Sequence, residues 1–160
     1  MERNLPMDAI EASVINLKET KGRILGVDFG DTRTGLAVSD ISRFLASGIG
    51  YVSPGGIEKT ADKVAEVARE QKVGAIVVGL PKNMDGSEGF RAERCREFAA
   101  LLYEKLEGSV KIAMIDERLT TMSASRYLNE TNTRGAHRKG VIDTLSAQII
   151  LQNALDRLKN

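Results

Sequence analysis

The first half of the chain alternates short apolar stretches with turn-forming residues. Apolar and β-branched side chains dominate residues 23–29, 34–39 and 46–52, and Gly, Asp, Thr and Pro stand between these stretches. This pattern is typical of strands bounded by turns. Because the connections are only a few residues long, neighbouring strands are expected to run antiparallel, and the three form a meander.

The second half alternates helical spacing with short, continuously apolar runs. Apolar residues at i, i+3 and i+4 predict helices, and the apolar runs predict strands, the first of them buried on both faces. A polar serine, Ser87, is expected to cap the second of these helices. In chain order the predicted elements are a helix over 57–71, a strand over 74–80, a helix over 87–108, a strand over 110–115, and helices over 120–130 and 138–158.

The order of these elements predicts an α/β fold built on a five-stranded mixed sheet. Each helix between two strands is long enough for a crossover, so the fourth and fifth strands are expected to lie parallel to the first. The sheet then has three antiparallel strands followed by two parallel ones, with helices on both faces. Residues 1–22 are predicted to be an N-terminal extension, and residues 23–160 to be one domain. The spacing of Ala9, Ile10, Val14 and Leu17 indicates a short amphipathic helix in the extension, which Gly22 and the surrounding charges separate from the core.

Composition indicates an ordinary globular protein. The chain has 160 residues, of which 42% are hydrophobic and 28% charged, as is usual for a single globular domain. No apolar run approaches the ~20 residues of a membrane span, and the N-terminus lacks the apolar core of a signal peptide. The single cysteine, Cys95, cannot form an intrachain disulfide. A cytoplasmic location without membrane partners is therefore expected.

Three acidic residues stand where the chain should bring them to one edge of the sheet. Asp28 lies inside the apolar run 24–30, Glu117 follows the apolar run 112–115, and Asp143 lies early in the last helix. Ligands of such sheets gather at the carboxyl ends of the parallel strands. A carboxylate in a buried strand is costly unless it is paired or bound to metal. The three acids together predict a site for divalent cations.

Metal-bound carboxylates at such an edge favour phosphodiester hydrolysis. Mg²⁺ and Mn²⁺ prefer oxygen ligands, and two such ions can activate a water and stabilise the leaving oxygen. Asp28 is predicted to bind the first metal, Glu117 to complete its shell or position water, and Asp143 to hold the second.

A local basic patch accompanies the acids, although the whole chain is nearly neutral, with 23 Lys and Arg against 22 Asp and Glu. Between residues 118 and 139 a single acidic residue, Glu130, stands among five basic ones. We expect this patch to contact a phosphate backbone, with a solvated surface as the alternative. Its basic members are Arg118, Arg126, Arg134, Arg138 and Lys139.

Several segments resemble the signatures of the YqgF/RuvX family. They include residues 25–30 (LGVDFG), 33–40 (RTGLAVSD), 78–87 (VGLPKNMDGS) and 116–121 (DERLTT). Asp143, in the sequence KGVID, completes the set, and the match runs in order over about residues 23–155. The resemblance implies a ribonuclease-H-like fold similar to that of the RuvC Holliday junction resolvase. It also implies a nuclease role in maturing the 5′ end of the 16S ribosomal RNA precursor.

The resemblance also implies which residues act. Asp28, Glu117 and Asp143 match the family's proposed active-site acids, although the choice between Asp116 and Glu117 stays open. Two basic residues lie inside the matching motifs and join the patch as expected nucleic-acid contacts. The full set of expected contacts is Arg33, Lys82, Arg118, Arg134, Arg138 and Lys139.

Other functions stay open at the level of sequence. The favoured partner is precursor rRNA, and the main alternative is branched DNA cut by a Holliday junction resolvase, with a monomer and a homodimer both open. A catalytically silent nucleic-acid-binding module is a second alternative. A third starts from residues 26–32, which also resemble the phosphate loop of actin-like ATPases and sugar kinases, but this chain supplies only one of the two lobes that such enzymes use.

Overall fold

Five strands form one mixed sheet, as predicted. The computed structural model describes residues 4–53, 55–117 and 135–159, and for residues 135–143 it describes the backbone alone. The sheet order is β3-β2-β1-β4-β5, with β1, β2 and β3 paired antiparallel and β1, β4 and β5 paired parallel. The strands are β1 (Ile24–Asp28), β2 (Thr34–Ser39), β3 (Ala46–Val52), β4 (Ala75–Leu80) and β5 (Lys111–Asp116).

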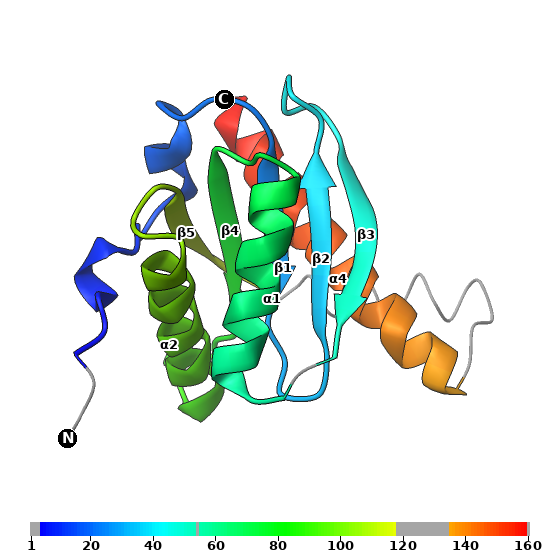
Figure 1. The fold of residues 1–160 in the computed structure, drawn as a ribbon. Helices are drawn as coiled ribbons and strands as arrows, with labels where there is room; N and C mark the ends of the chain where they lie inside the picture. The colour runs from blue at the N-terminus through cyan, green and yellow to red at the C-terminus, as the bar shows by residue number, and fades with distance from the viewer. Residues whose placement is uncertain (1–3, 54, 118–134, 160) are drawn as a thin grey trace.

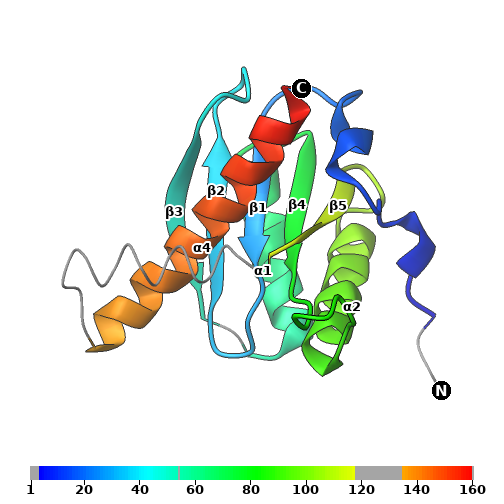
Figure 2. The same cartoon turned by 180° about the vertical axis from the view of Figure 1, so that it is seen from behind.

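Helices cover both faces of this sheet, which confirms the second part of the predicted architecture (Figure 1). On one face lie α1 (Ile57–Glu70) and α2 (Phe90–Lys105), which pack against each other. On the other face α4 (Gly135–Leu158) crosses β1, β2 and β3 (Figure 2). None of the helices within the described ranges combines the length and apolar character that crossing a membrane requires.

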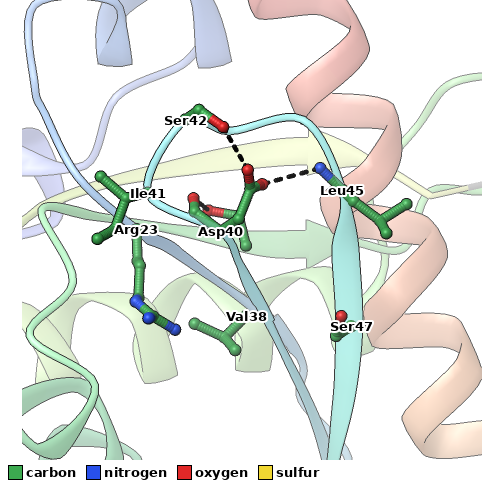
Figure 3. A pocket seen from close by; sticks show the side chains of 8 residues that line it. Arg23, Val38, Asp40, Ile41, Ser42, Leu45 and Ser47 are labelled. Carbon is green, nitrogen blue, oxygen red and sulfur yellow. Dashed lines mark hydrogen bonds between the residues drawn. The ribbon is translucent and has the colours of Figure 1, made fainter.

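The loop between β2 and β3 closes on a carboxylate at the amino end of β1 (Figure 3). Asp40 accepts hydrogen bonds from the backbone N–H of Phe44 at 2.8 Å and of Leu45 at 3.0 Å, and from the Ser42 hydroxyl. The Leu45 N–H, followed by the Ser42 hydroxyl, lowers the pKa of Asp40 to about 2. A cavity of about 610 Å³ beside this loop is lined by Arg23 and Ser47 among others. The role of Asp40 is therefore structural, because its carboxylate closes the loop between β2 and β3.

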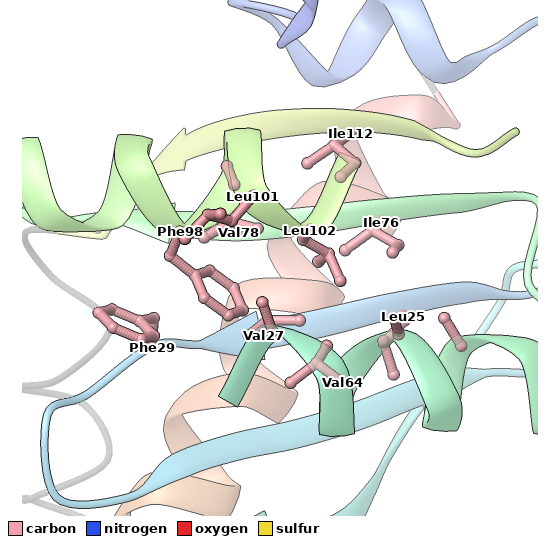
Figure 4. Close-up of a cluster of buried hydrophobic side chains, with 14 of the residues drawn as sticks. Leu25, Val27, Phe29, Val64, Ile76, Val78, Phe98, Leu101, Leu102 and Ile112 are labelled. Atoms are coloured by element: carbon pink, nitrogen blue, oxygen red, sulfur yellow. The ribbon is translucent and has the colours of Figure 1, made fainter. Parts of the chain in front are cut away.

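The core under α1 and α2 follows from strict alternation along the strands (Figure 4). Leu25 and Val27 of β1 face this side and are fully buried, because successive side chains of a strand point to opposite faces. Phe29, next on the same face, stacks on Phe98 of α2 with ring centroids 4.5 Å apart. The preceding position, Asp28, therefore belongs to the face that α4 covers.

Helix α4 approaches that face closely, because β1 carries no side chain at Gly26. A Cβ there would lie 2.6 Å from the Cβ of Leu151 and 3.0 Å from the carbonyl oxygen of Ala147. Both helix residues are fully buried. The early part of α4, which contains position 143, continues from this contact across the sheet to β3, where Thr144 packs over Gly48.

The N-terminal segment differs from its prediction. It forms two short 3-10 helices, η1 (Met7–Ala9) and η2 (Val14–Leu17), instead of one amphipathic α-helix. Between them Glu11 extends the sheet, donating from its N–H to the Ile112 carbonyl at 2.8 Å. Val14 and Leu17 are 2% and 0% exposed, within the core under α4. The prediction of a separate helix was wrong because so short a helix is marginal alone, whereas the free edge of β5 offers backbone partners.

Ser87 does not cap α2, which begins at Phe90 after Gly89. Its hydroxyl instead donates to Asp85 at 2.5 Å and accepts from the Asn83 side chain at 3.0 Å. These local bonds compete with helix capping, and they shape the loop that follows β4.

We expect Leu17→Ala to lower the free energy of unfolding by about 2–5 kcal/mol, since it empties a fully buried site. Ile15→Ala, two residues away where the side chain is 45% exposed, is the matched control and should change stability by less than about 1 kcal/mol. Urea denaturation of both variants measures the difference. Equal, small losses would mean that the segment is not part of the folded core.

Candidate active site

Two of the predicted acids meet at the carboxyl ends of three neighbouring strands. Val27 of β1 pairs with Val78 of β4, so one further step in this parallel register places Asp28 beside Gly79. On the other side of β4, the Glu117 N–H donates to the Leu80 carbonyl at 3.2 Å, just past the end of β5. Gly79 thus stands between the strand ends that carry Asp28 and Glu117.

The missing side chain at Gly79 is what lets the two acids approach each other. A Cβ at this position would lie 2.2 Å from Oε2 of Glu117 and 2.7 Å from Cδ1 of Ile150 on α4. The Glu117 side chain therefore folds back over β4, beneath α4. There its carboxyl group shares a hydrogen bond with that of Asp28.

Burial dominates the electrostatics of this acid pair. Glu117 is only 8% exposed, and this burial raises its pKa to about 6 from an ordinary value of 4.5. The nearby charge of Arg91 lowers the pKa, Asp116 raises it, and the hydrogen bond with Asp28 lowers it. Two carboxylates this close cannot both stay ionised without a compensating positive charge. The pair is suited to sharing a proton or binding a cation.

Asp116 and Glu117, between which the sequence could not choose, point to different places. Glu117 lies over Gly79 with Asp28, whereas Asp116 lines a separate cavity with Lys82. Neighbouring residues of an extended chain point in opposite directions, so only one of them can face Asp28. In this structure that residue is Glu117.

The third acid, Asp143, is placed only by its backbone. It lies in α4 one turn before Ala147, the residue whose carbonyl oxygen packs against Gly26. Its side chain is outside the described part of the structure, so its contribution to the site stays a prediction. Asp28 and Glu117 are the two predicted acids whose side chains the structure brings together.

The predicted nucleic-acid contacts are only partly described. Arg33, at the start of β2, places its guanidinium 6.0 Å from the ring centroid of Tyr51 on β3. Lys82 follows β4 and lines the cavity beside Asp116. Arg118 and Arg134 lie outside the described residues, and Arg138 and Lys139 are in the first turns of α4 with only their backbone described.

Helix α2 adds two residues that sequence reasoning did not assign to the site. The charge of Arg91 acts on both Glu117 and Cys95. Burial raises the pKa of Cys95 to about 12, and the negative charges of Glu117 and Asp28 add to this rise. Arg91 and Cys95, with Asp31, also line a cavity of about 320 Å³. Arg91 is exposed in the first turn of α2, where sequence pattern gives no functional signal.

The acid pair fits a hard divalent cation in the chemistry of its donors. Both groups are carboxylates, which suit Mg²⁺ and Mn²⁺. Any side chain at position 79 would fill the space above Gly79 that Oε2 of Glu117 occupies. Within the described residues no three metal-binding side chains cluster, so the pair supplies part of a coordination shell.

The sequence matches one protein family along most of its length. A family model named RuvX and described as a Holliday junction resolvase matches residues 22–157. A protein of Ruminiclostridium cellulolyticum named "Putative pre-16S rRNA nuclease" is 42% identical over 137 residues, covering 85% of this chain and 95% of its own. A protein of Halothermothrix orenii with the same name is 44% identical over 138 residues, covering 84% and 94%.

Comparison of structures confirms the ribonuclease-H-like fold. RuvC of T. thermophilus, solved in complex with a Holliday junction substrate, superimposes with a TM-score of 0.51 at 14% identity, covering 85% of this chain and 95% of its own. The fowlpox virus Holliday junction resolvase gives 0.50 at 11% identity, covering 85% and 99%. At these identities the likeness establishes the fold alone.

The raised pKa of Glu117 predicts a pH-dependent stability. A carboxyl whose folded-state pKa is about 6 instead of 4.5 favours folding below pH 4.5, and this advantage is lost as pH rises through 6. Relative to Glu117→Gln, the intact protein should lose about 2 kcal/mol of unfolding free energy between pH 4.5 and 7.

Chemical denaturation in the presence of chelator measures this difference. Glu66→Gln, which changes an exposed glutamate of α1, is the control. A difference between the intact protein and Glu117→Gln that stays constant over this pH range would contradict the burial of the carboxyl.

Gly79→Ala should displace Glu117 and lower the unfolding free energy by about 1–3 kcal/mol, because its Cβ would overlap Oε2 of Glu117 and crowd Ile150. Combining it with Glu117→Ala removes the first overlap, so the double variant should lose less than the sum of the two single losses. Thermal unfolding of the four proteins tests this. Simple additivity would mean that Gly79 and Glu117 do not meet.

Proposed function

This chain belongs to the RuvX family, and from that premise we propose that it is a hydrolytic nuclease acting on the 5′-extended precursor of 16S ribosomal RNA. The name shared by its relatives supports this substrate. The observation that carries the proposal is the buried pair of Asp28 and Glu117. A carboxyl pair kept under a helix at the carboxyl edge of a sheet costs stability, and cleavage chemistry accounts for that cost.

We assign Asp28, Glu117 and Asp143 as the residues that hold one or two Mg²⁺ or Mn²⁺ ions. Such ions activate water and stabilise the leaving oxygen of a phosphodiester. The chain's own groups set the conditions for this chemistry. Glu117, with its pKa near 6, changes its protonation state close to neutral pH, and Arg91 places a positive charge next to the pair.

Precursor rRNA is favoured over branched DNA, and the choice rests on the relatives. The second candidate, a Holliday junction resolvase, is favoured by the description of the matching family and by the fold of RuvC. Symmetric cutting of a four-way junction is most simply done by a two-fold dimer, because protein symmetry mirrors substrate symmetry. The assay must therefore compare the two substrates directly.

Asp28→Asn should reduce metal-dependent cleavage by at least about 100-fold, since it removes a carboxylate from the centre of the site while keeping its shape. Cleavage of 5′-extended 16S precursor RNA and of a synthetic four-way DNA junction is measured side by side with Mg²⁺, Mn²⁺ and chelator. Asp62→Asn, on the exposed surface of α1, is the matched control and should retain activity.

The outcomes separate the candidates. Metal-dependent cutting of RNA that is lost in Asp28→Asn supports the proposal, and cutting of the junction instead supports the resolvase. Binding of RNA without any cutting favours a silent nucleic-acid-binding module. Near-normal cleavage by Asp28→Asn would refute the assignment of the acid pair.

A further inference from the structure

A second cavity, of about 290 Å³, lies at the edge of the sheet beside the acid pair. Three cationic side chains from three different elements line it, namely Lys82 after β4, Arg96 of α2 and Arg157 of α4. One carboxylate, Asp116, and the hydroxyl-bearing Ser13 of the N-terminal segment complete its polar wall. Its lining residues therefore carry three positive charges against one negative charge.

The cations differ in how they are held. Arg96 is fixed by two hydrogen bonds to the Glu88 carboxylate, at 2.7 and 2.8 Å. Lys82 and Arg157 form no ion pair with any residue in the described part of the chain. Like charges that face one partly enclosed space repel each other, and an anion in that space relieves the repulsion. With Glu88 counted beside Asp116, the charges in and around the cavity are three positive and two negative, so a net positive charge still favours an anionic group there.

The position of the cavity relates it to the proposed chemistry. Its wall includes Asp116, which precedes Glu117 in sequence. It also includes Leu80, whose carbonyl accepts a hydrogen bond from the N–H of Glu117. The cavity therefore borders the ends of β4 and β5, the strand ends next to which the acid pair lies. We infer that this cavity binds a backbone phosphate of the nucleic-acid strand, adjacent to the phosphate that is cleaved. This inference rests on the proposed nuclease function and adds a binding subsite to it.

The N-terminal segment takes part in this subsite. Ala12, Ser13 and Val14 form one wall, and they lie outside residues 22–157, the range that matches the family. The segment is held in place by the bridge between Glu11 and Ala113 and by the burial of Leu17. Its contribution is to close the cavity on the side where β5 would otherwise be open to solvent.

The test measures binding separately from cleavage. A 5′-labelled single-stranded fragment of the 16S precursor is titrated with protein in chelator, and fluorescence anisotropy is followed from 50 to 200 mM salt. Arg157→Gln and Lys82→Gln should each weaken binding about 3–10-fold and reduce the slope of log affinity against log salt by about 0.7. Lys72→Gln, an exposed cation in the turn between α1 and β4, is the charge-matched control and should change neither.

A second readout identifies the phosphate. Replacing the RNA phosphates one at a time by neutral methylphosphonates should weaken binding of the intact protein at one position near the cleavage site. Arg157→Gln should show no further loss at that position, and Arg157→Lys should restore part of the sensitivity. A merely structural role for Arg157 would leave the position-dependence unchanged.

The outcomes distinguish this inference from the proposed function. If Arg157→Gln and Lys82→Gln behave like Lys72→Gln while the intact protein cleaves RNA, the subsite is refuted and the nuclease stands. If the variants lose affinity as expected but the intact protein never cleaves, the nuclease is refuted; the cavity then stands as a phosphate-binding site, and its place beside a scissile phosphate is refuted with the nuclease. An intact protein that binds no RNA would overturn the subsite as well.

Discussion

The close contact between helix α4 and the sheet is the constraint on which the site depends. α4 passes over glycines on three strands, and a Cβ at any of them would overlap a helix side chain. Thr144 lies over Gly48, Leu151 over Gly26 and Ile150 over Gly79. Helices normally stand farther from a sheet because side chains separate them. Here the glycines have no side chains, so the helix packs directly against the strands. The same absence at Gly79 leaves the space that the Glu117 carboxylate fills.

Burying the carboxyl group of Glu117 lowers the stability of the fold at neutral pH. A buried carboxyl with a raised pKa opposes folding at neutral pH, and the surrounding core must offset that cost. The apolar contacts of α4 do so, with Ala147, Ile150 and Leu151 fully buried on the same side of the sheet as Asp28. The acid pair therefore lies beside a layer of fully buried apolar side chains.

The sheet could be predicted from sequence because its strands and turns are set by residues close together in the chain. Apolar runs indicate the strands and short connections indicate their antiparallel pairing, and together they place Asp28 and Glu117 at one edge of the sheet. The pattern could not show that Gly79 stands between them, since that depends on the register of two separate strand pairs. It also missed the 3-10 helices of the N-terminal segment, whose backbone partners lie about 100 residues away on β5.

The charges around the acid pair follow from a conflict that any such nuclease faces. Clustered carboxylates repel a phosphodiester, and this repulsion is strong where water is excluded. Metal ions held by the proposed site would offset this repulsion at the scissile phosphate, but not at the phosphates on either side. The structure places Arg91 close to the acids and Lys82, Arg96 and Arg157 around the adjoining cavity. These cations come from separate elements, so the positive charge around the acid pair is assembled only when the whole fold is formed.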